Sequence, residues 1–323
     1  MRANIVGNGT FSGLATFMGA GMSLMQQIPL SSTADGLAHR LRTLAGRAHL
    51  LNRDSILELA HERLRRREER LLLTAARDGR AECSSVEAEP LVTVRVSTYE
   101  RADVLLDRTI PSILAQTYPR LEILVVGDCT ADDTEERLRR VGDPRIRFVN
   151  LPYRPHYPAQ DARRWRVLGY QALNLSLDLA RGAWIAPCDD DDELTPDHVA
   201  VMLDCAQRDH AEFVHSNTGL VLGGGVLGVI GRPEVADGHT SHGAIFYSAA
   251  LRFFRYNGQV WRLRRSLDWD LVLRMADAGV RMAYLDEVTY HYHPSPASLA
   301  EWQAKALALR PDLAPQLGEQ GRP

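Results

Sequence analysis

Residues 183–196 read AWIAPCDDDDELTP, in which four consecutive aspartates follow a short apolar run. An apolar run of this length, bounded by a turn, predicts a buried strand. Carboxylates in such a row repel one another. Two unit charges about 5 Å apart, at an effective dielectric constant of about 20, cost roughly 3 kcal/mol. The sequence therefore predicts that a cation binds at the end of this strand.

Strands and helices alternate along the sequence from Leu91 onward. The segments between apolar runs carry helical periodicity. The apolar runs themselves predict strands over 91–97, 121–127, 146–150, 183–187 and 211–217. This alternation predicts an α/β fold with a mostly parallel sheet flanked by helices. Ligands of such sheets bind beyond the carboxyl ends of the strands, where Tyr99, Asp128 and the aspartates stand.

The composition is that of a globular protein, with 45% hydrophobic and 24% charged residues among 323. A net charge of −3 argues against nucleic-acid binding. Because Lys305 is the only lysine, arginine, backbone N–H groups or a metal must meet any bound phosphate. Residues 11–30 are interrupted by Gly, Ser and Gln, so we expect no transmembrane segment there. The four cysteines form no C-x-x-C pair, which favours a cytoplasmic location.

The N-terminal part of the chain differs in character from the rest. Leu57, Leu64 and Leu71 recur every seven residues on a predicted helix, within the charged stretch HERLRRREER. Two interpretations stay open: a solvated helix that lies on the main domain, or a pairing helix for a homodimer or another partner protein. We expect three parts, namely a helical extension and linker over 1–89, a main domain over 90–298, and a C-terminal helix and tail over 299–323.

Strand geometry separates the four aspartates in part. Alternate residues of an extended segment point the same way, so Asp189 and Asp191 are expected to face one site. Carboxylate oxygens suit Mg²⁺ or Mn²⁺, and Mg²⁺ commonly uses one or two carboxylates together with substrate phosphates. The alternative is a solvated acidic loop at the positive end of the next helix, predicted over 196–209. The position after a buried strand favours the metal site.

Several longer segments, taken in order, resemble one enzyme family. They are VTVRVSTYERADVLLDRTIPSILAQTYPRLEILVVGD (92–128), ALNLSLDLARGAWIAPCDDDDELTPDH (172–198) and SLDWDLVLRMADAG (266–279). From Leu91 to about Ser298 the chain is similar to the nucleotide-sugar glycosyltransferases of family 2, which have the Rossmann-like GT-A fold. The second segment resembles the stretch with the metal-binding Asp-x-Asp motif, and the third resembles the segment with the catalytic base.

The resemblance implies an inverting glycosyltransferase. It would move a sugar from a nucleoside diphosphate sugar, UDP-linked by expectation, to an acceptor hydroxyl, with Mn²⁺ or Mg²⁺ on the diphosphate. Asp268 stands at the position of the general base, and Asp191 and His293 at those of metal ligands. Donor-sugar contacts are expected from Asp192 and Asp270. Nucleotide contacts are expected from Thr98, Tyr99, Glu100, Arg101, Asp128, Arg166, Asn174, Asp189 and Asp190.

Alternatives stay open at several positions. Asp270 competes with Asp268 for the role of base, and Asp268 alone could be a helix N-cap. A zinc site at His291 and His293 lacks a third soft ligand nearby. The chain also departs from the family pattern at Leu173 and Gly127, where many members carry an arginine and a second acid. These departures motivate a second hypothesis, a sugar-nucleotide-binding module without turnover. A third is another aspartate-rich Mg²⁺ enzyme, such as a nucleotidyltransferase.

Overall fold

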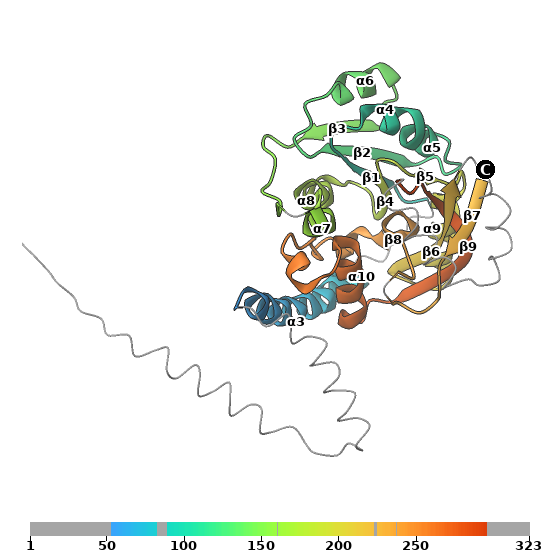
Figure 1. The fold of residues 1–323 in the computed structure, drawn as a ribbon. Helices are drawn as coiled ribbons and strands as arrows, with labels where there is room; N and C mark the ends of the chain where they lie inside the picture. The colour runs from blue at the N-terminus through green and yellow to red at the C-terminus, as the bar shows by residue number, and fades with distance from the viewer. Residues whose placement is uncertain (1–52, 83–88, 160, 223–224, 237, 296–323) are drawn as a thin grey trace, which may run out of the picture. The chain divides into compact units, whose positions relative to one another are not determined.

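A single mixed sheet forms the centre of the fold in the computed structural model, which describes residues 53–82, 89–159, 161–222, 225–236 and 238–295 (Figure 1). Predictions about residues 1–52 and 296–323 lie outside these ranges. In the described chain the strand order is β3-β2-β1-β4-β8-β6-β9-β5, with β7 paired to β6. The strands are β1 (Val92–Thr98), β2 (Leu121–Gly127), β3 (Ile146–Asn150), β4 (Trp184–Asp189), β5 (Glu193–Leu194), β6 (Phe213–Leu222), β7 (Gly225–Ile230), β8 (Ile245–Ser248) and β9 (Met282–Tyr292).

The first half of the sheet is parallel, as the alternation of strands and helices predicts. β1 pairs in parallel with β2 and β4, and β2 pairs in parallel with β3. Beyond β4 the sheet is mixed, because β8 pairs antiparallel with both β4 and β6, whereas β6 and β9 pair in parallel. The expected α/β fold is confirmed, although the second half has fewer parallel pairs than expected.

Helices cover both faces of the parallel half. Ile123 and Val125 of β2 pack in one apolar cluster with η3, α5 and α9, while Leu124 and Val126 face the other way and pack with Ala172 of α8. This alternation is the two-residue period of a strand buried on both sides. The helical segments are α3 (Arg53–Glu82), α4 (Ala102–Val104), η3 (Leu105–Thr109), α5 (Ile110–Leu114), α6 (Thr134–Val141), α7 (Asp161–Arg164), η4 (Trp165–Val167), α8 (Tyr170–Leu179), α9 (His198–Arg208), η5 (His242–Ala244), η6 (Ala249–Leu251), η7 (Val260–Leu263) and α10 (Leu267–Ala278).

Helix α3 packs on the sheet domain through its acidic side chains. Glu58, Glu62 and Glu69 are nearly fully buried. Asn257 donates to Glu58 over 2.7 Å, Arg265 donates to Glu62 over 2.7 Å, and Arg274 pairs with Glu69. The expectation of a helix that lies on the main domain agrees with these contacts. Within the described chain, no helix is both long enough and apolar enough to cross a membrane.

The leucine stripe of α3 faces away from the domain. Leu57 is 48% exposed, and Leu64 and Leu71 are each 66% exposed. The buried face therefore carries three glutamates beside Leu73, and the open face carries three leucines, unlike the apolar inner face of an ordinary surface helix. Pairing of two chains through this stripe stays a prediction.

Replacing Leu57, Leu64 and Leu71 together with glutamine tests the pairing prediction. We expect the triple variant to lose dimer mass in light scattering while keeping its helical circular dichroism, because these side chains contribute little to the core. A control variant, Leu73→Gln, alters a leucine that is 2% exposed and should destabilise the fold instead. An unchanged mass in the triple variant, or a monomeric wild type, would rule out pairing through the stripe.

Candidate functional site

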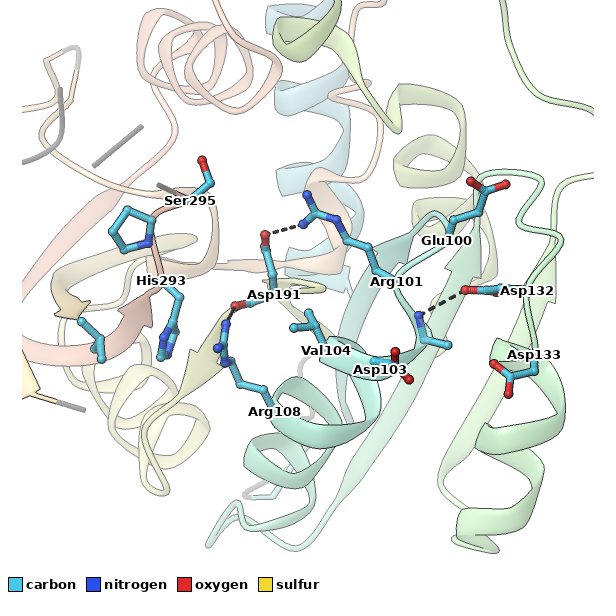
Figure 2. A pocket seen from close by; sticks show the side chains of 13 residues that line it. Glu100, Arg101, Asp103, Val104, Arg108, Asp132, Asp133, Asp191, His293 and Ser295 are labelled. Atoms are coloured by element: carbon cyan, nitrogen blue, oxygen red, sulfur yellow. Dashed lines mark hydrogen bonds and ion pairs between the residues drawn. The ribbon is translucent and has the colours of Figure 1, made fainter. Parts of the chain in front are cut away.

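Three strand ends meet at one edge of the sheet. Ser97 pairs with Asp189, and Thr98 pairs with Gly127, so the residues that follow β1, β2 and β4 are neighbours. Beside this edge lies a cavity of about 880 Å³ (Figure 2). Its lining residues are Glu100, Arg101, Ala102, Asp103, Val104, Arg108, Asp132, Asp133, Asp191, Val221, His293, Pro294 and Ser295.

Asp191 is the aspartate of the run that lines the cavity. Its carboxylate pairs with Arg101, and Arg108 donates to its backbone carbonyl over 2.6 Å (Figure 2). Burial raises the pKa of Asp191, while the Arg101 guanidinium acts in the opposite direction. Part of the repulsion predicted for the aspartates is therefore relieved by an arginine of the chain itself.

Asp189 contacts a different set of groups. Its Oδ1 lies 2.7 Å from His242 Nδ1, and Tyr290 donates to its Oδ2 over 3.4 Å. Burial opposes ionisation of Asp189, but His242, Arg95 and Tyr290 together outweigh it, so the pKa of the carboxyl is lowered. The expectation that Asp189 and Asp191 face one site does not fit these contacts. Residues 190 and 191 form a turn rather than an extended segment, so the strand period does not apply.

Asp192 is fully buried and does not line the cavity. It accepts a hydrogen bond from the backbone N–H of His293 over 2.8 Å and another from the hydroxyl of Tyr290. Burial raises the pKa of Asp192 well above its ordinary value. The predicted donor-sugar contact does not fit this position. Both carboxylate oxygens of Asp192 already accept hydrogen bonds from residues at the end of β9, and these bonds connect the turn after β4 to that strand.

Asp190 is also largely buried, and its Oδ1 lies 3.4 Å from Arg101 Nη1. Burial, together with the charge of Asp191, raises the pKa of Asp190 to about 6. Above that pH the folded protein holds an ionised buried carboxylate. The unfolded chain ionises near the ordinary value of 3.8, so this group lowers the free energy of unfolding fully above about pH 6 and progressively less as the pH falls from there to about 4.

The variant Asp190→Asn isolates this pH dependence. Without divalent cations, we expect it to be more stable than the wild type by about 1–3 kcal/mol at about pH 7.5, with the difference shrinking below about pH 6 and closing near pH 4. Urea unfolding of both proteins across this range measures the difference. Both proteins also contain His198 and His215, whose pKa values burial lowers to about 4 and which therefore favour unfolding as the pH falls. The difference in unfolding free energy between the two proteins cancels this contribution. A difference that stays constant with pH would show that Asp190 does not titrate there.

Asp128 forms a cluster with three side chains from two loops. Tyr157 donates to its Oδ2 over 2.7 Å, and Arg154 Nε lies 3.6 Å from the same oxygen. The Arg154 guanidinium stacks 3.3 Å from the centroid of the Tyr99 ring. Burial raises the pKa of Asp128. Its other oxygen, Oδ1, is buried without a hydrogen-bond partner in the described part of the chain, which suits a donor group of a bound ligand.

Arg154 and Tyr157 were not predicted as site residues. They lie in the proline-rich loop LPYRPHYPAQ that follows β3. The signal available in the sequence was the position of this loop, because it follows a parallel strand next to β2, the strand that Asp128 follows. Thr98 ends β1 beside this cluster and is 2% exposed.

Two predicted nucleotide contacts do not fit their positions. The amide of Asn174 donates to the carbonyl of Tyr256 over 2.9 Å and accepts from its N–H over 2.8 Å, so its polar atoms are used inside the fold. Arg166 donates to the carbonyl of Arg264 over 2.9 Å. Neither Asn174 nor Arg166 lines the cavity. Both lie on segments that pack against the η6–η7 region rather than at the strand ends.

Asp268 and Asp270 lie in the first turn of α10 but in different surroundings. Ser266 is the N-cap of the helix, so Asp268 is not. Asp268 lines a small cavity together with His242, the partner of Asp189. Asp270 is fully buried, and its Oδ2 accepts from Arg274 over 2.8 Å. Its predicted contact with a donor sugar does not fit this burial, and Asp268 is the better placed of the two for a base.

His293 lines the large cavity and lies 2.7 Å, through Nε2, from Glu193 Oε2. The described residues contain no group of three or more His, Cys, Asp or Glu side chains that could hold a metal ion. Asp191 and His293 both line the large cavity, and their role as metal ligands stays a prediction.

Comparisons with known proteins agree with this architecture. Residues 93–160 and 161–253 match the family described as Glycosyl transferase family 2. The chain is 33% identical over 153 residues to the succinoglycan biosynthesis protein ExoO of Rhizobium meliloti, covering 47% of this chain and 40% of that protein. It is 29% identical over 132 residues to the putative colanic acid biosynthesis glycosyl transferase WcaA of Escherichia coli, covering 40% and 42%. The chain thus spans about two fifths of the length of these relatives.

Two solved structures share the fold. S. aureus TarS 1–349 in complex with UDP-GlcNAc superposes with a TM-score of 0.51 at 16% identity, covering 64% of this chain and 59% of TarS. The mannosyltransferase PcManGT from Pyrobaculum calidifontis, in complex with GDP-Man and Mn²⁺, gives 0.50 at 16% identity, covering 78% and 72%. Residues 93–253 of this chain therefore belong to glycosyl transferase family 2, and the domain that contains them has the GT-A fold.

Proposed function

We propose that this protein is an inverting glycosyltransferase that moves a sugar from a nucleoside diphosphate sugar to an acceptor hydroxyl. The observation that carries the proposal is the cavity of about 880 Å³ at the carboxyl ends of the strands, whose wall holds Asp191, His293, Arg101 and Arg108. The cavity wall thus combines oxygen and nitrogen atoms that can bind a cation with two guanidinium groups that can bind phosphates. The Asp128 cluster beside β2 supplies a buried acceptor for a nucleobase.

The chemistry assigns a role to each group. Negative charge develops on the diphosphate as the sugar leaves, and a bound divalent cation would stabilise that charge as a Lewis acid. Asp191 and His293 would hold the cation, while Arg101 and Arg108 would bind phosphate oxygens. Asp268 would accept the proton of the acceptor hydroxyl on the face opposite the leaving group, which gives inversion.

The ligands of the two structural neighbours guide the choice of donor. TarS is described with UDP-GlcNAc and PcManGT with GDP-Man and Mn²⁺. We infer a UDP-sugar as the first donor to test and a GDP-sugar as the second. The names of ExoO and WcaA concern polysaccharide biosynthesis, which supports a saccharide as the acceptor.

A sugar-nucleotide-binding module without turnover is the second candidate. Leu173 favours it, since this buried leucine stands where the family resemblance places an arginine. The departure at Gly127 has a local cause. A Cβ at Gly127 would lie 2.4 Å from Asn150 Oδ1, an atom that accepts a hydrogen bond from the N–H of Thr130. The Asn150 amide thus takes the space of a second acidic side chain.

Thermal stabilisation by UDP, dTDP, GDP and their sugars, with and without Mn²⁺, tests the proposal. A ligand at 100 times its dissociation constant should stabilise the protein by about 2.7 kcal/mol. We expect one nucleotide class to raise the melting temperature, and to do so more with Mn²⁺. No stabilisation by any nucleotide would contradict both candidates, whereas binding without release of nucleoside diphosphate would favour the module.

A further inference from the structure

Two sequence segments rich in arginine and tryptophan come together on the surface. They are RRWR (163–166), which spans α7 and η4, and WRLRR (261–265), which spans η7. Arg166 donates to the carbonyl of Arg264 over 2.9 Å, and the Arg163 guanidinium lies 5.2 Å from the centroid of Trp261. We call this surface the arginine–tryptophan platform, defined by Arg163, Trp165, Arg166, Trp261 and Arg262.

Each indole of the platform carries a stacked guanidinium. Arg166 lies 4.7 Å from the centroid of Trp165, and Arg262 lies 4.7 Å from that of Trp261. Trp165 is nonetheless 55% exposed, so one face of its ring stays accessible. Stacking holds each guanidinium in a fixed orientation, which lowers the entropy lost when its N–H fork binds an anion.

The charges of Arg163 and Arg166 are available to a ligand. Among the described residues, no carboxylate forms an ion pair with Arg163 or Arg166. Arg139, an exposed arginine on α6, pairs by contrast with Glu135. A rigid pair of unneutralised guanidinium groups beside an open indole face is a suitable site for a ring that carries an anionic group.

The position of the platform connects it to the proposed active site. On one side η7 leads directly into α10, whose first turn carries Asp268. On the other side the segment after η4 reaches Gly169, whose N–H donates over 3.0 Å to the Tyr157 hydroxyl, and Tyr157 in turn donates to Asp128. The platform thus adjoins both the element with the proposed base and the cluster proposed for the nucleotide.

We propose that the platform binds the acceptor and that the acceptor is an acidic saccharide, an inference that rests on the proposed glycosyl transfer. The apolar face of a pyranose ring packs on the Trp165 indole, and a carboxylate or phosphate on the saccharide accepts hydrogen bonds from Arg163 and Arg166. The net charge of −3 disfavours nucleic acid. An indole already covered on one face by a guanidinium is a poor group to insert into a lipid layer.

Calorimetry with a short oligogalacturonate and a neutral malto-oligosaccharide of equal length tests the platform on the full chain. We expect the wild type to bind the acidic probe more tightly than the neutral one. Trp165→Ala and Arg166→Gln should each weaken binding of the acidic probe by about tenfold, and Trp165→Phe should restore most of it. Arg139→Gln, an exposed arginine on α6, should change nothing.

The remaining outcomes separate this inference from the proposed function. Binding of UDP with Mn²⁺ should be unchanged in Trp165→Ala and Arg166→Gln. If the wild type binds UDP but binds neither saccharide, or both equally, the platform assignment is wrong and the proposed function stands. If phosphatidylglycerol vesicles bind instead and the same substitutions abolish that binding, the platform is a membrane site. If no nucleotide binds to any variant, the proposed function itself fails.

Discussion

Replacing Asp268 with asparagine is expected to lower the rate of sugar transfer by about 10²–10⁴-fold, the usual contribution of a general base. The amide is nearly isosteric with the carboxylate but cannot accept the proton of the acceptor hydroxyl. Ser266, and not Asp268, occupies the N-cap position of α10, so the helix should keep its first turn in the variant. Binding of UDP with Mn²⁺ should therefore match that of the wild type, and only the catalytic rate constant should fall.

Asp270→Asn is the matched control for this prediction. Asp270 lies two residues further along α10, where it pairs with Arg274 and lies 3.7 Å from Arg265. Removing one partner of a buried ion pair costs about 3–5 kcal/mol of stability. We expect this variant to unfold at lower urea concentration and to keep its catalytic rate constant per folded molecule. Near-wild-type transfer by Asp268→Asn, with loss of transfer in folded Asp270→Asn, would assign the base to Asp270.

Asp191→Ala is expected to abolish the metal-dependent part of nucleotide binding. Removing a group that only orients a metal ligand lowers metal affinity by about 10–100-fold. Removing the ligand itself should therefore lower metal affinity by more than about 100-fold. Isothermal calorimetry with UDP, with and without Mn²⁺, measures this effect. In the variant, the affinity with Mn²⁺ should fall to the value found without it.

Asp190→Asn is the control for Asp191→Ala, because it removes a neighbouring carboxylate that does not line the cavity. We expect it to keep most of the Mn²⁺ effect on UDP binding. Unchanged UDP affinity in Asp191→Ala, with Mn²⁺ present, would remove Asp191 as the metal ligand. A loss in both variants would mean that the turn after β4 as a whole, rather than one carboxylate, determines binding.

Local sequence patterns predicted the parallel half of the sheet well. The run LEILVVG became β2 at the predicted residues, and every residue of that segment is buried, including the one charged residue, Glu122. The helical segment before β4 is divided into η4 and α8 at Gly169, whose φ of +72° places it in the left-handed region that glycine favours. A glycine inside an otherwise periodic segment was the available signal.

Candidate site residues that directly follow a strand could be predicted from the sequence. Residues whose contacts come from a distant segment of the chain were harder to predict. Asp128 and Asp191 could be singled out from their positions alone. The contact of Asp189 with His242 joins residues 53 apart, and no local pattern predicts it. Asp270 is instructive because its partner Arg274 lies four residues later on the same helix. That spacing in the sequence already favoured an ion pair over a ligand contact.

The most direct test of the account is the time course of nucleoside diphosphate release from the sugar nucleotide that stabilises the protein. The reaction is run with Mn²⁺ and saccharide acceptors, in the wild type and in Asp191→Ala and Asp268→Asn. The account predicts release and an inverted anomeric product in the wild type, and little of either in both variants or after chelation of the metal. Absence of release from every donor, or equal release by all three proteins, would contradict it.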